Sequence, residues 1–416
     1  MDKIEITGGV KLHGEVTISG AKNAVLPLMT ATILSSGENI IRNVPNLRDV
    51  MTMGKLLAHL GFGFHLEDNQ ILLQAKKITS LDAPYDFVKT MRASVLVLGP
   101  LLASTGRAKV SLPGGCAIGA RPINLHIMGL EKMGAKIKLS EGYIEAKAKQ
   151  LKGATIYFDI PTVTGSENLM MAATLADGTT ILENAACEPE VVDLANALIS
   201  MGADIQGAGT SIIRIKGVNK LRPLDYTVIP DRIETATFIA AAAITRGDVN
   251  IKGGRPEHLE AVINKIKEAG VRVVQKNDKL IVKGPERLSP IDIKTMPHPG
   301  FPTDMQAQFM ALMSIADGTS LITESIFENR FMHVAELRRM GADITVEGST
   351  ATVKGVKSFK GAPVMATDLR ASASLVVAGL AAHGTTVIDR VYHLDRGYEG
   401  IEEKLRKLGA KIRRVK

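Results

Sequence analysis

The sequence predicts an α/β fold in which three buried helices lie inside three sheets, an arrangement that occurs twice along the 416 residues. Three observations predict it: a short phrase recurs six times, long apolar segments of helical length precede predicted strands, and the two halves of the chain correspond. The chain is also longer than the roughly 100–200 residues of one domain, so two domains are expected.

The recurring phrase reads Leu-x-x-(Met/Leu/Ala)-Gly with small variations and is followed by a strand-like run. Its glycines are Gly61, Gly134, Gly202, Gly270, Gly341 and Gly409, which are spaced 68–73 residues apart. Each is expected to end an amphipathic helix, because glycine adopts the left-handed conformation at low cost. Turns such as EDNQ, SEGY, KNDK and VEGS follow, as is typical of hairpins.

The long apolar segments include residues 23–34, 93–103, 236–244 and 371–382. They are apolar nearly all round, which predicts buried helices rather than half-exposed ones. A second glycine set follows these helices and precedes strands: Gly37, Gly106, Gly178, Gly247, Gly318 and Gly384. No unit has a polar capping version, so a closed arrangement is favoured over an open solenoid.

The two halves of the chain match in detail: MRASVLVLGPLLASTG at 91–106 resembles LRASASLVVAGLAAHG at 369–384. We therefore expect a first three-repeat domain over residues 22–229, which carries a cysteine loop. Residues 1–21 with 230–416 are expected to form the second, because the six units need a circular permutation to close.

Composition narrows the class of protein. The net charge of +8 suggests acidic partners, but 4% aromatic residues and no tryptophan argue against a nucleic-acid stacking surface. Two cysteines cannot form a disulfide framework or a multi-cysteine zinc site. The N-terminus has no apolar signal region, and apolar stretches fall short of the roughly 18 residues of a membrane span. These features predict a cytoplasmic protein.

The unusual charges cluster where helices begin. Four arginines lie in equivalent loops: Arg121, Arg255, Arg330 and Arg396. Arginines beside helix N-termini suit bound anions, although a surface salt bridge is the ordinary alternative. The buried helices begin with Lys22-Asn23, Arg92, Ser166-Glu167, Asp231 to Glu234, Asp304 and Asp368 to Arg370. These are either N-caps and interdomain ion pairs, or the lining of a cleft between two domains that binds an anionic substrate.

The loop LPGGCAIGARPINLH (112–126) places Cys116 among glycines and beside an arginine. A thiol is mostly protonated at neutral pH, and a nearby arginine stabilises the thiolate, so Cys116 can act as an acid or as a nucleophile. His126 suggests a Cys-His hydrolase pair, but no nearby Asn or Asp orients it. The loop has neither a GxGxxG nor a P-loop pattern.

Four segments resemble the UDP-N-acetylglucosamine enolpyruvyl transferases of the EPSP synthase superfamily: SGAKNA (19–24), LPGGCAIGARP (112–122), FPTDMQAQFMAL (301–312) and HLDRGYEGIEEKL (393–405). The resemblance runs end to end. It implies two inside-out α/β barrels of three repeats each, and transfer of enolpyruvyl from phosphoenolpyruvate to the 3′-hydroxyl of UDP-N-acetylglucosamine. This is the first committed step of peptidoglycan synthesis, and so of cell-wall biogenesis, cell shape and cell division. No metal, organic cofactor, nucleic acid or membrane is implied, and the chain is expected to be a monomer.

The resemblance also implies roles for residues. Cys116 would protonate the methylene of phosphoenolpyruvate and would be the residue that fosfomycin alkylates. Lys22, Arg121 and Arg396 would hold the phosphate and carboxylate, Asn23 would position the tetrahedral intermediate, and Asp304 would accept the proton of the attacking hydroxyl and contact the sugar. The nucleotide-sugar site would be lined by Arg92, Arg121, Pro122, Ile123, Asn124, Leu125, Thr162, Val163, Thr164 and Ile326, with Asp368 and Arg370 behind these contacts.

Three positions depart from the family pattern. The family commonly has Asp at Asn124 and Arg at Cys187, and a Ser-Val-Gly form within PTVTGSEN (161–168). These departures affect the contact of Asn124 to uridine, any salt bridge at position 187 and the roles of Thr162 to Thr164. Alternative functions are enolpyruvyl transfer to shikimate 3-phosphate, a non-catalytic repeat scaffold that binds polyanions, and a hydrolase that uses Cys116 and His126. The Leu-Pro-Gly-Asp-Lys-Ser start of the shikimate enzymes is missing here.

Overall fold

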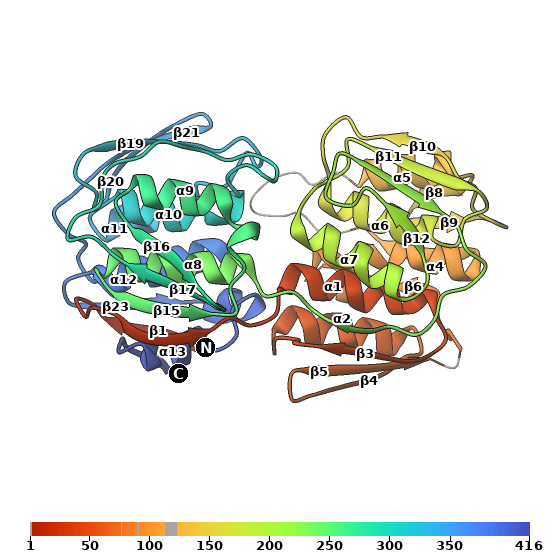
Figure 1. Cartoon of the computed structure of the whole chain (residues 1–416), viewed down its shortest axis with the longest axis horizontal. Coiled ribbons are helices and arrows are strands. Elements are labelled where there is room, and N and C mark those ends of the chain that lie inside the picture. The colour runs from red at the N-terminus through yellow and green to blue at the C-terminus, as the bar shows by residue number, and fades with distance from the viewer. Residues whose placement is uncertain (1, 76, 90, 113–122) are drawn as a thin grey trace. The chain divides into compact units, whose positions relative to one another are not determined.

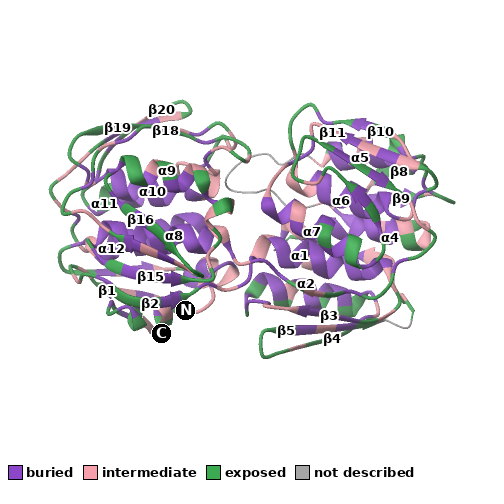
Figure 2. Ribbon diagram, in the orientation of Figure 1, coloured by how far each residue is buried: buried purple, intermediate pink, exposed green. Residues whose placement is uncertain are grey.

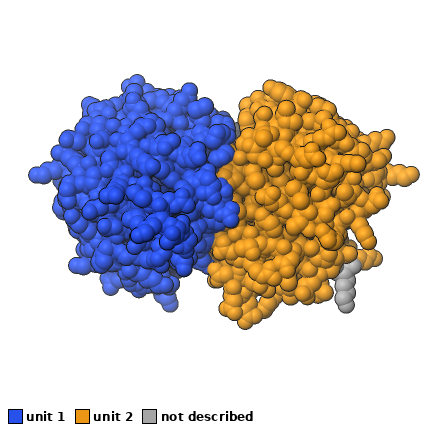
Figure 3. Space-filling view, in the orientation of Figure 1, with its two compact units in different colours: residues 1–19, 116–120, 230–416 blue, residues 20–115, 121–229 orange. Residues whose placement is uncertain are grey.

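The computed structural model describes residues 2–416 except 76, 90 and 113–122. The described residues form two compact units (Figures 1 and 3). Unit 1 contains residues 2–19 and 230–416, and unit 2 contains the described part of 20–229. Each unit has its own continuous apolar core.

Unit 1 contains three four-stranded sheets, with strand orders β22-β23-β1-β24, β16-β17-β15-β2 and β18-β19-β21-β20. Their strands are β22 (Pro363–Met365), β23 (Thr385–Asp389), β1 (Lys3–Thr7), β24 (Lys411–Val415), β16 (Arg272–Lys276), β17 (Lys279–Lys283), β15 (Asp248–Lys252), β2 (His13–Thr17), β18 (Ile293–Lys294), β19 (Thr319–Thr323), β21 (Thr350–Lys354) and β20 (Asp343–Glu347). Each sheet has one parallel pair, and its other pairs are antiparallel. The two N-terminal strands thus belong to the same unit as the C-terminal strand.

The helices of unit 1 fall into two classes, which Figure 2 shows by their colour. The buried helices are α8 (Arg232–Ile244), α10 (Gln306–Met313) and α12 (Leu369–Ala381), and the amphipathic ones are α9 (Glu260–Glu268), α11 (Val334–Arg339) and α13 (Ile401–Lys407). Every residue of α10 is buried, and so is every residue of α8 except Arg232. The buried helices inside sheets that the sequence predicts are therefore confirmed.

Unit 2 repeats this plan with the sheets β14-β3-β5-β4, β6-β7-β9-β8 and β10-β11-β13-β12. Their strands are β14 (Asp225–Thr227), β3 (Gly37–Arg42), β5 (Gln70–Ala75), β4 (Gly63–Glu67), β6 (Asp82–Ala83), β7 (Arg107–Ser111), β9 (Tyr143–Lys147), β8 (Lys136–Ser140), β10 (Thr155–Tyr157), β11 (Thr179–Glu183), β13 (Ile212–Lys216) and β12 (Asp204–Gln206). The last strand, β14, pairs in parallel with the first, β3, which closes the unit on itself.

The buried helices of unit 2 are α1 (Lys22–Ala31), α4 (Leu98–Thr105) and α6 (Val163–Ala173). The more exposed ones are α2 (Arg48–His59), the short α3 (Tyr85–Val88), α5 (Asn124–Lys132) and α7 (Pro189–Ser200). The expected helix over 93–103 differs from the prediction, because Arg92–Val97 forms a 3-10 helix and α4 begins only at Leu98. Because α4 begins at Leu98, Pro100 lies in its first turn, where the missing N–H of proline removes no helical hydrogen bond.

The marker glycines behave as predicted. All six have positive φ, between 91° at Gly134 and 108° at Gly61. In the second set Gly247 differs, because the left-handed residue there is Arg246, with φ of 56°. Glycine is still needed at 247, since a Cβ atom would lie 2.5 Å from the carbonyl oxygen of Leu12. The predicted turns at 67–70, 140–143, 276–279 and 346–349 connect antiparallel strands and are confirmed as hairpins.

Candidate active site

The predicted site residues are distributed over both units. Cys116, Arg121 and Pro122 lie outside the described residues. Unit 1 contributes Asp304, Ile326, Asp368, Arg370 and Arg396, and unit 2 contributes Lys22, Asn23, Arg92, residues 123–125 and residues 162–164.

In unit 1, Asp304 is held by two arginines. It lies on a 3-10 turn, Thr303–Met305, directly before α10. Its Oδ1 accepts a hydrogen bond from Arg330 Nη2 at 2.7 Å, and its Oδ2 accepts from Arg370 Nη2 at 2.8 Å and Nε at 3.0 Å. Both arginine side chains are 5% exposed, whereas a quarter of the Asp304 side chain is exposed. A carboxylate clamped in this way has a fixed orientation and remains partly open to a ligand.

The two arginines also keep Asp304 ionised. Burial favours the neutral acid, but the charges and hydrogen bonds of Arg370 and Arg330 outweigh burial and hold the pKa of Asp304 well below its usual range. Asp304 is consequently a weak base in this arrangement, since a carboxylate with a low pKa has little tendency to take up a proton. The position suits a fixed negative charge better than a proton acceptor.

Asp231 and Asp368 are N-caps. Asp231 accepts hydrogen bonds from the backbone N–H groups of Ile233 (2.8 Å) and Glu234 (2.9 Å) at the start of α8. Asp368 accepts them from Arg370 (2.8 Å) and Ala371 at the start of α12. The N-cap interpretation therefore holds for both, and Asp368 also fixes the helical turn from which Arg370 reaches Asp304.

The other predicted residues of unit 1 lie on short segments. Arg396 ends the 3-10 helix Val391–Arg396. Burial, followed by the charge of Arg396, lowers the pKa of His393 on the same helix. Ile326 is half-buried just after β19, and its N–H donates to Glu324 Oε1 at 2.9 Å. Tyr398, to which the sequence analysis gave no role, receives a hydrogen bond from Arg370 Nη1 at 3.3 Å. Its signal in the sequence is its place in the family-like HLDRGYEGIEEKL segment.

Two of the four loop arginines, Arg330 and Arg255, differ in burial. Arg330 is buried against Asp304, whereas Arg255 is exposed at the start of a short 3-10 turn, Pro256–His258. The shared loop position thus leads to a site contact for Arg330 and to a surface position for Arg255.

In unit 2, Lys22 begins α1, with Asn23 next to it. The Nζ atom of Lys22 lies 3.1 Å from Asp49 Oδ2 on α2, and the side chains are 13% and 5% exposed. This contact directs a nearly buried ammonium group to the start of α1, where the positive end of the helix dipole adds to its charge. The combination favours a bound anion.

A polar network joins the starts of three other helices of unit 2. His126 on α5 lies 2.9 Å from Asn168 Nδ2 through Nδ1, and 3.3 Å from Thr164 Oγ1 through Nε2. Asn168 on α6 accepts a hydrogen bond from the N–H of Gly99 at 2.7 Å, which fixes the direction of its amide. Its Nδ2 therefore donates to His126 Nδ1, and Nε2–H of the neutral imidazole faces Thr164.

This network corrects one expectation. No Asn or Asp close in sequence was expected to orient His126, yet Asn168, 42 residues later, contacts its ring. The contact joins α5 and α6, whose starts carry residues 123–125 and 162–164 of the predicted nucleotide-sugar site. Asn168 Nδ2 also donates to the carbonyl oxygen of Val95 at 3.4 Å, within the 3-10 helix that Arg92 begins. Thr162 itself caps α6 through Oγ1, which accepts from the N–H of Gly165 at 3.2 Å.

His126 predicts a pH dependence of stability. Burial, followed by the charge of Arg92, lowers the pKa of His126 from 6.5 to about 4. Between these pH values the unfolded chain binds a proton at His126 that the folded chain does not. The contribution of His126 to the free energy of unfolding is therefore fully present above pH 6.5 and is lost as the pH drops towards 4. We expect a loss on the order of 3 kcal/mol, measured by urea unfolding between pH 7.5 and 4.5.

A matched pair of variants isolates this contribution. His126→Gln should flatten the pH dependence, whereas His65→Gln should not, because the His65 side chain is 66% exposed. An unchanged slope in His126→Gln would contradict the assignment.

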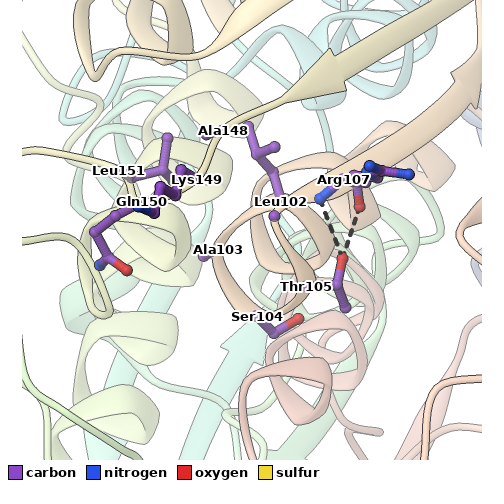
Figure 4. A pocket seen from close by; sticks show the side chains of 10 residues that line it. Leu102, Ala103, Ser104, Thr105, Arg107, Ala148, Lys149, Gln150 and Leu151 are labelled. Atoms are coloured by element: carbon purple, nitrogen blue, oxygen red, sulfur yellow. Dashed lines mark hydrogen bonds between the residues drawn. The ribbon is translucent and has the colours of Figure 1, made fainter.

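A cavity of about 380 Å³ lies elsewhere in unit 2, at the C-terminal end of α4 (Figure 4). It is lined by residues 102–107 and 148–151, and Thr105 Oγ1 donates to the carbonyl oxygen of Arg107 at 2.7 Å beside it. None of the predicted site residues lines this cavity, so it is not part of the candidate site.

Two further properties concern only the described residues. They contain no group of three or more His, Cys, Asp and Glu side chains that could hold a metal ion. In the same part of the chain, every helix is too short or too polar to cross a bilayer.

Comparison with known proteins places the chain in a family. Residues 6–405 match the model of EPSP synthase (3-phosphoshikimate 1-carboxyvinyltransferase). The chain is 66% identical to the UDP-N-acetylglucosamine 1-carboxyvinyltransferase of Thermodesulfovibrio yellowstonii, and 58% identical to that of Myxococcus xanthus, over the full length of both chains in each case.

Solved structures agree. The enolpyruvyl transferase NikO from Streptomyces tendae superposes with a TM-score of 0.89 at 27% identity, covering 100% of this chain and 99% of that one. EPSP synthase from Acinetobacter baumannii gives 0.78 at 21% identity over both full chains, which supports the shared fold. The predicted fold of two three-repeat α/β barrels is confirmed, and the chain belongs to the EPSP synthase (3-phosphoshikimate 1-carboxyvinyltransferase) family.

Proposed function

We propose that this protein transfers the enolpyruvyl group of phosphoenolpyruvate to the 3′-hydroxyl of UDP-N-acetylglucosamine and releases phosphate. The observation that carries the proposal is 58–66% identity, over full length, to proteins named UDP-N-acetylglucosamine 1-carboxyvinyltransferase. The family description names 3-phosphoshikimate, but the solved EPSP synthase is only 21% identical and supports the fold alone.

The reaction adds a hydroxyl across the double bond of phosphoenolpyruvate and then eliminates phosphate. A proton must reach the methylene carbon, the hydroxyl oxygen must bond to the adjacent carbon, and loss of a methyl proton with phosphate restores the double bond. For these steps we propose Cys116 as proton donor, Lys22, Arg121 and Arg396 as ligands of the phosphate and carboxylate, and Asn23 as a contact of the tetrahedral intermediate.

Asp304 is proposed to hold the sugar hydroxyl and to stabilise the positive charge that develops on the reacting carbon. A preorganised charge is worth most where it needs no rearrangement during the reaction, and the clamp by Arg330 and Arg370 provides such a charge. Its low pKa makes proton uptake secondary to this role.

The nucleotide sugar is proposed to bind to residues of both units: Arg92, Arg121, Pro122, Ile123, Asn124, Leu125, Thr162, Val163, Thr164, Asp304 and Ile326, with Asp368 and Arg370 in support. The hydrogen bonds of His126 and Asn168 support this assignment, because they join α5, α6 and the 3-10 helix Arg92–Val97, which carry several of these residues. Residues 22–229, and 1–21 with 230–416, are proposed as the structural domains.

In the cell, we propose that the protein acts as a monomer in the cytoplasm, in the first committed step of peptidoglycan synthesis. It would then serve cell-wall biogenesis, cell shape and division, and would be a target of fosfomycin. The chain's 58–66% identity to the named relatives supports this role.

Phosphate release from phosphoenolpyruvate tests the proposal directly. Release is expected with UDP-N-acetylglucosamine as acceptor and not with shikimate 3-phosphate. Release with shikimate 3-phosphate alone would establish the alternative transferase. No release with either acceptor would contradict the proposed reaction, and binding to polyanions would then be measured.

A further inference from the structure

Glu324 is a buried carboxylate that the proposed reaction does not use. It follows directly after β19 in unit 1 and is 4% exposed. A buried carboxylate is expensive unless several hydrogen bonds satisfy its oxygens, and here both oxygens are engaged on different sides.

One oxygen fixes the backbone around Ile326. Oε1 of Glu324 accepts hydrogen bonds from the N–H of Ile326 at 2.9 Å, the N–H of Phe327 at 3.2 Å and Oγ1 of Thr295 at 2.9 Å. Two successive backbone donors on one carboxylate oxygen determine the path of the segment that carries Ile326.

The other oxygen reaches Asp304 through two side chains. Oε2 of Glu324 accepts the hydroxyl hydrogen of Thr303 at 2.8 Å. Because that hydrogen is engaged, a lone pair of Thr303 Oγ1 is free to accept from Arg330 Nη1 at 2.8 Å. The same guanidinium donates through Nη2 to Asp304 at 2.7 Å. Glu324 therefore orients Thr303, which orients Arg330, which holds Asp304.

The repeats show that the fold does not require a carboxylate here. The residues that follow β3, β7, β11, β15 and β23 in the same way are Asn43, Leu112, Asn184, Gly253 and Arg390, and none of them is a carboxylate. Four of these five have positive φ, from 55° to 81°, a conformation that Leu112 and Glu324 do not share. The amides of Asn43 and Asn184 each cap one carbonyl group, those of Val228 and Phe158. At this corner, the repeat that contains β19 has a carboxylate that serves two partners, where two other repeats have an amide that serves one.

We propose that Glu324 is a positioning residue that fixes both Ile326 and Asp304 in the orientation in which they contact the nucleotide sugar. The inference rests on the proposed function, in which these two residues contact UDP-N-acetylglucosamine. Glu324 itself touches neither substrate. Its two oxygens couple the two contacts, so that both are formed, or lost, together.

Glu324→Gln tests the coupling with almost no change in shape. The amide oxygen can still accept from the two backbone N–H groups, but the NH₂ group then faces Thr303 and cannot accept its hydroxyl hydrogen. The hydrogen bond that orients Thr303 towards Glu324 is therefore lost or reversed. We expect the Kd of UDP-N-acetylglucosamine, measured by titration calorimetry, to rise on the order of 10-fold. Thr303→Val should weaken binding in the same way, whereas Thr303→Ser, which keeps the hydroxyl, should bind UDP-N-acetylglucosamine as tightly as wild type.

Stability is measured in parallel to exclude a general structural effect. Asn184→Gly removes the corresponding cap in unit 2 and accepts the positive φ, so it should lower the urea midpoint without changing the Kd. The double variant Glu324→Gln/Thr303→Val should weaken binding less than the product of the single effects, because both act through one chain of contacts.

The outcomes separate this inference from the proposed function. If wild-type protein binds UDP-N-acetylglucosamine and Glu324→Gln and Thr303→Val bind it equally well, the positioning role is overturned and the function stands. Equal loss of binding in Asn184→Gly would also overturn it. If wild-type protein neither binds the nucleotide sugar nor releases phosphate with it, the proposed function itself fails.

Discussion

Replacing Asp304 with asparagine should lower kcat for phosphate release on the order of 10²- to 10⁴-fold. The substitution keeps the size of the side chain but removes the negative charge that Arg330 and Arg370 hold in place. The amide also presents N–H groups to guanidinium donors, so at least one of the two contacts becomes repulsive. The proposed reacting centre then loses a preorganised negative charge.

The same variant should also be less stable. Removing one partner from a fully buried ion pair costs about 3–5 kcal/mol, and the loss here should be smaller, because a quarter of the Asp304 side chain is exposed. The matched control is Asp317→Asn in the same unit, whose partner is Arg287 at 3.1 Å and whose side chain is 67% exposed. That variant should retain wild-type kcat and stability.

Single-turnover phosphate release and urea unfolding distinguish the two effects. Activity that stays within a few-fold of wild type in folded Asp304→Asn would show that Asp304 makes no contact with the reacting atoms. Because its pKa lies well below the usual range, wild-type activity should not fall through protonation of Asp304 between pH 8 and 5.

Replacing Cys116 with serine should reduce phosphate release by a similarly large factor, about 10²- to 10⁴-fold. The residue lies outside the described part of the chain, and the expectation follows from the resemblance and from thiol chemistry. A thiol with a pKa near 8.5 is a far better proton donor to carbon than a serine hydroxyl. Fosfomycin should add to wild-type protein and not to Cys116→Ser, as measured by intact mass.

The second cysteine provides the control. Cys187 lies half-buried before α7, where burial and the charge of Glu188 raise the pKa of its thiol and keep it protonated. Cys187→Ser should therefore keep wild-type activity and still accept one fosfomycin group. An adduct that persists in Cys116→Ser, or full activity in that variant, would contradict the role of Cys116.

Local patterns account for most of the predicted fold. Apolar segments and helix-ending glycines depend on residues a few positions apart, so they can be recognised directly, as Gly61 and Gly341 show. The 3-10 helix over Arg92–Val97 was missed because hydropathy does not distinguish it from an α-helix. Pro100, which is favoured in the first turn of a helix, lies close to the break, but Pro27 lies inside α1 without one, so proline alone did not locate it.

Much less of the site was predictable. Its predicted residues came from short motifs, but their partners lie far away in sequence: Arg370 contacts Asp304 from 66 residues on, and Asn168 contacts His126 from 42. Hydrogen bonds between polar side chains have no sequence period, so only the folded chain shows which residues pair. Glu324 illustrates this, since nothing in TESIFENR distinguishes its carboxylate from the exposed Glu328 nearby.

The placement of β1 between β23 and β24 has a consequence for biosynthesis. Ile4 pairs with Ile388, so the first strand leaves the ribosome long before its partners exist. At about 5–20 residues per second, the delay is roughly 20–80 s. Unit 2 is synthesised in the meantime as one uninterrupted stretch and can finish folding during translation, while Ile4 and Ile6 remain without a sheet. Nascent chains stalled after residue 229 should therefore contain a protease-resistant unit 2 attached to a cleavable N-terminal arm, which a holding chaperone would protect.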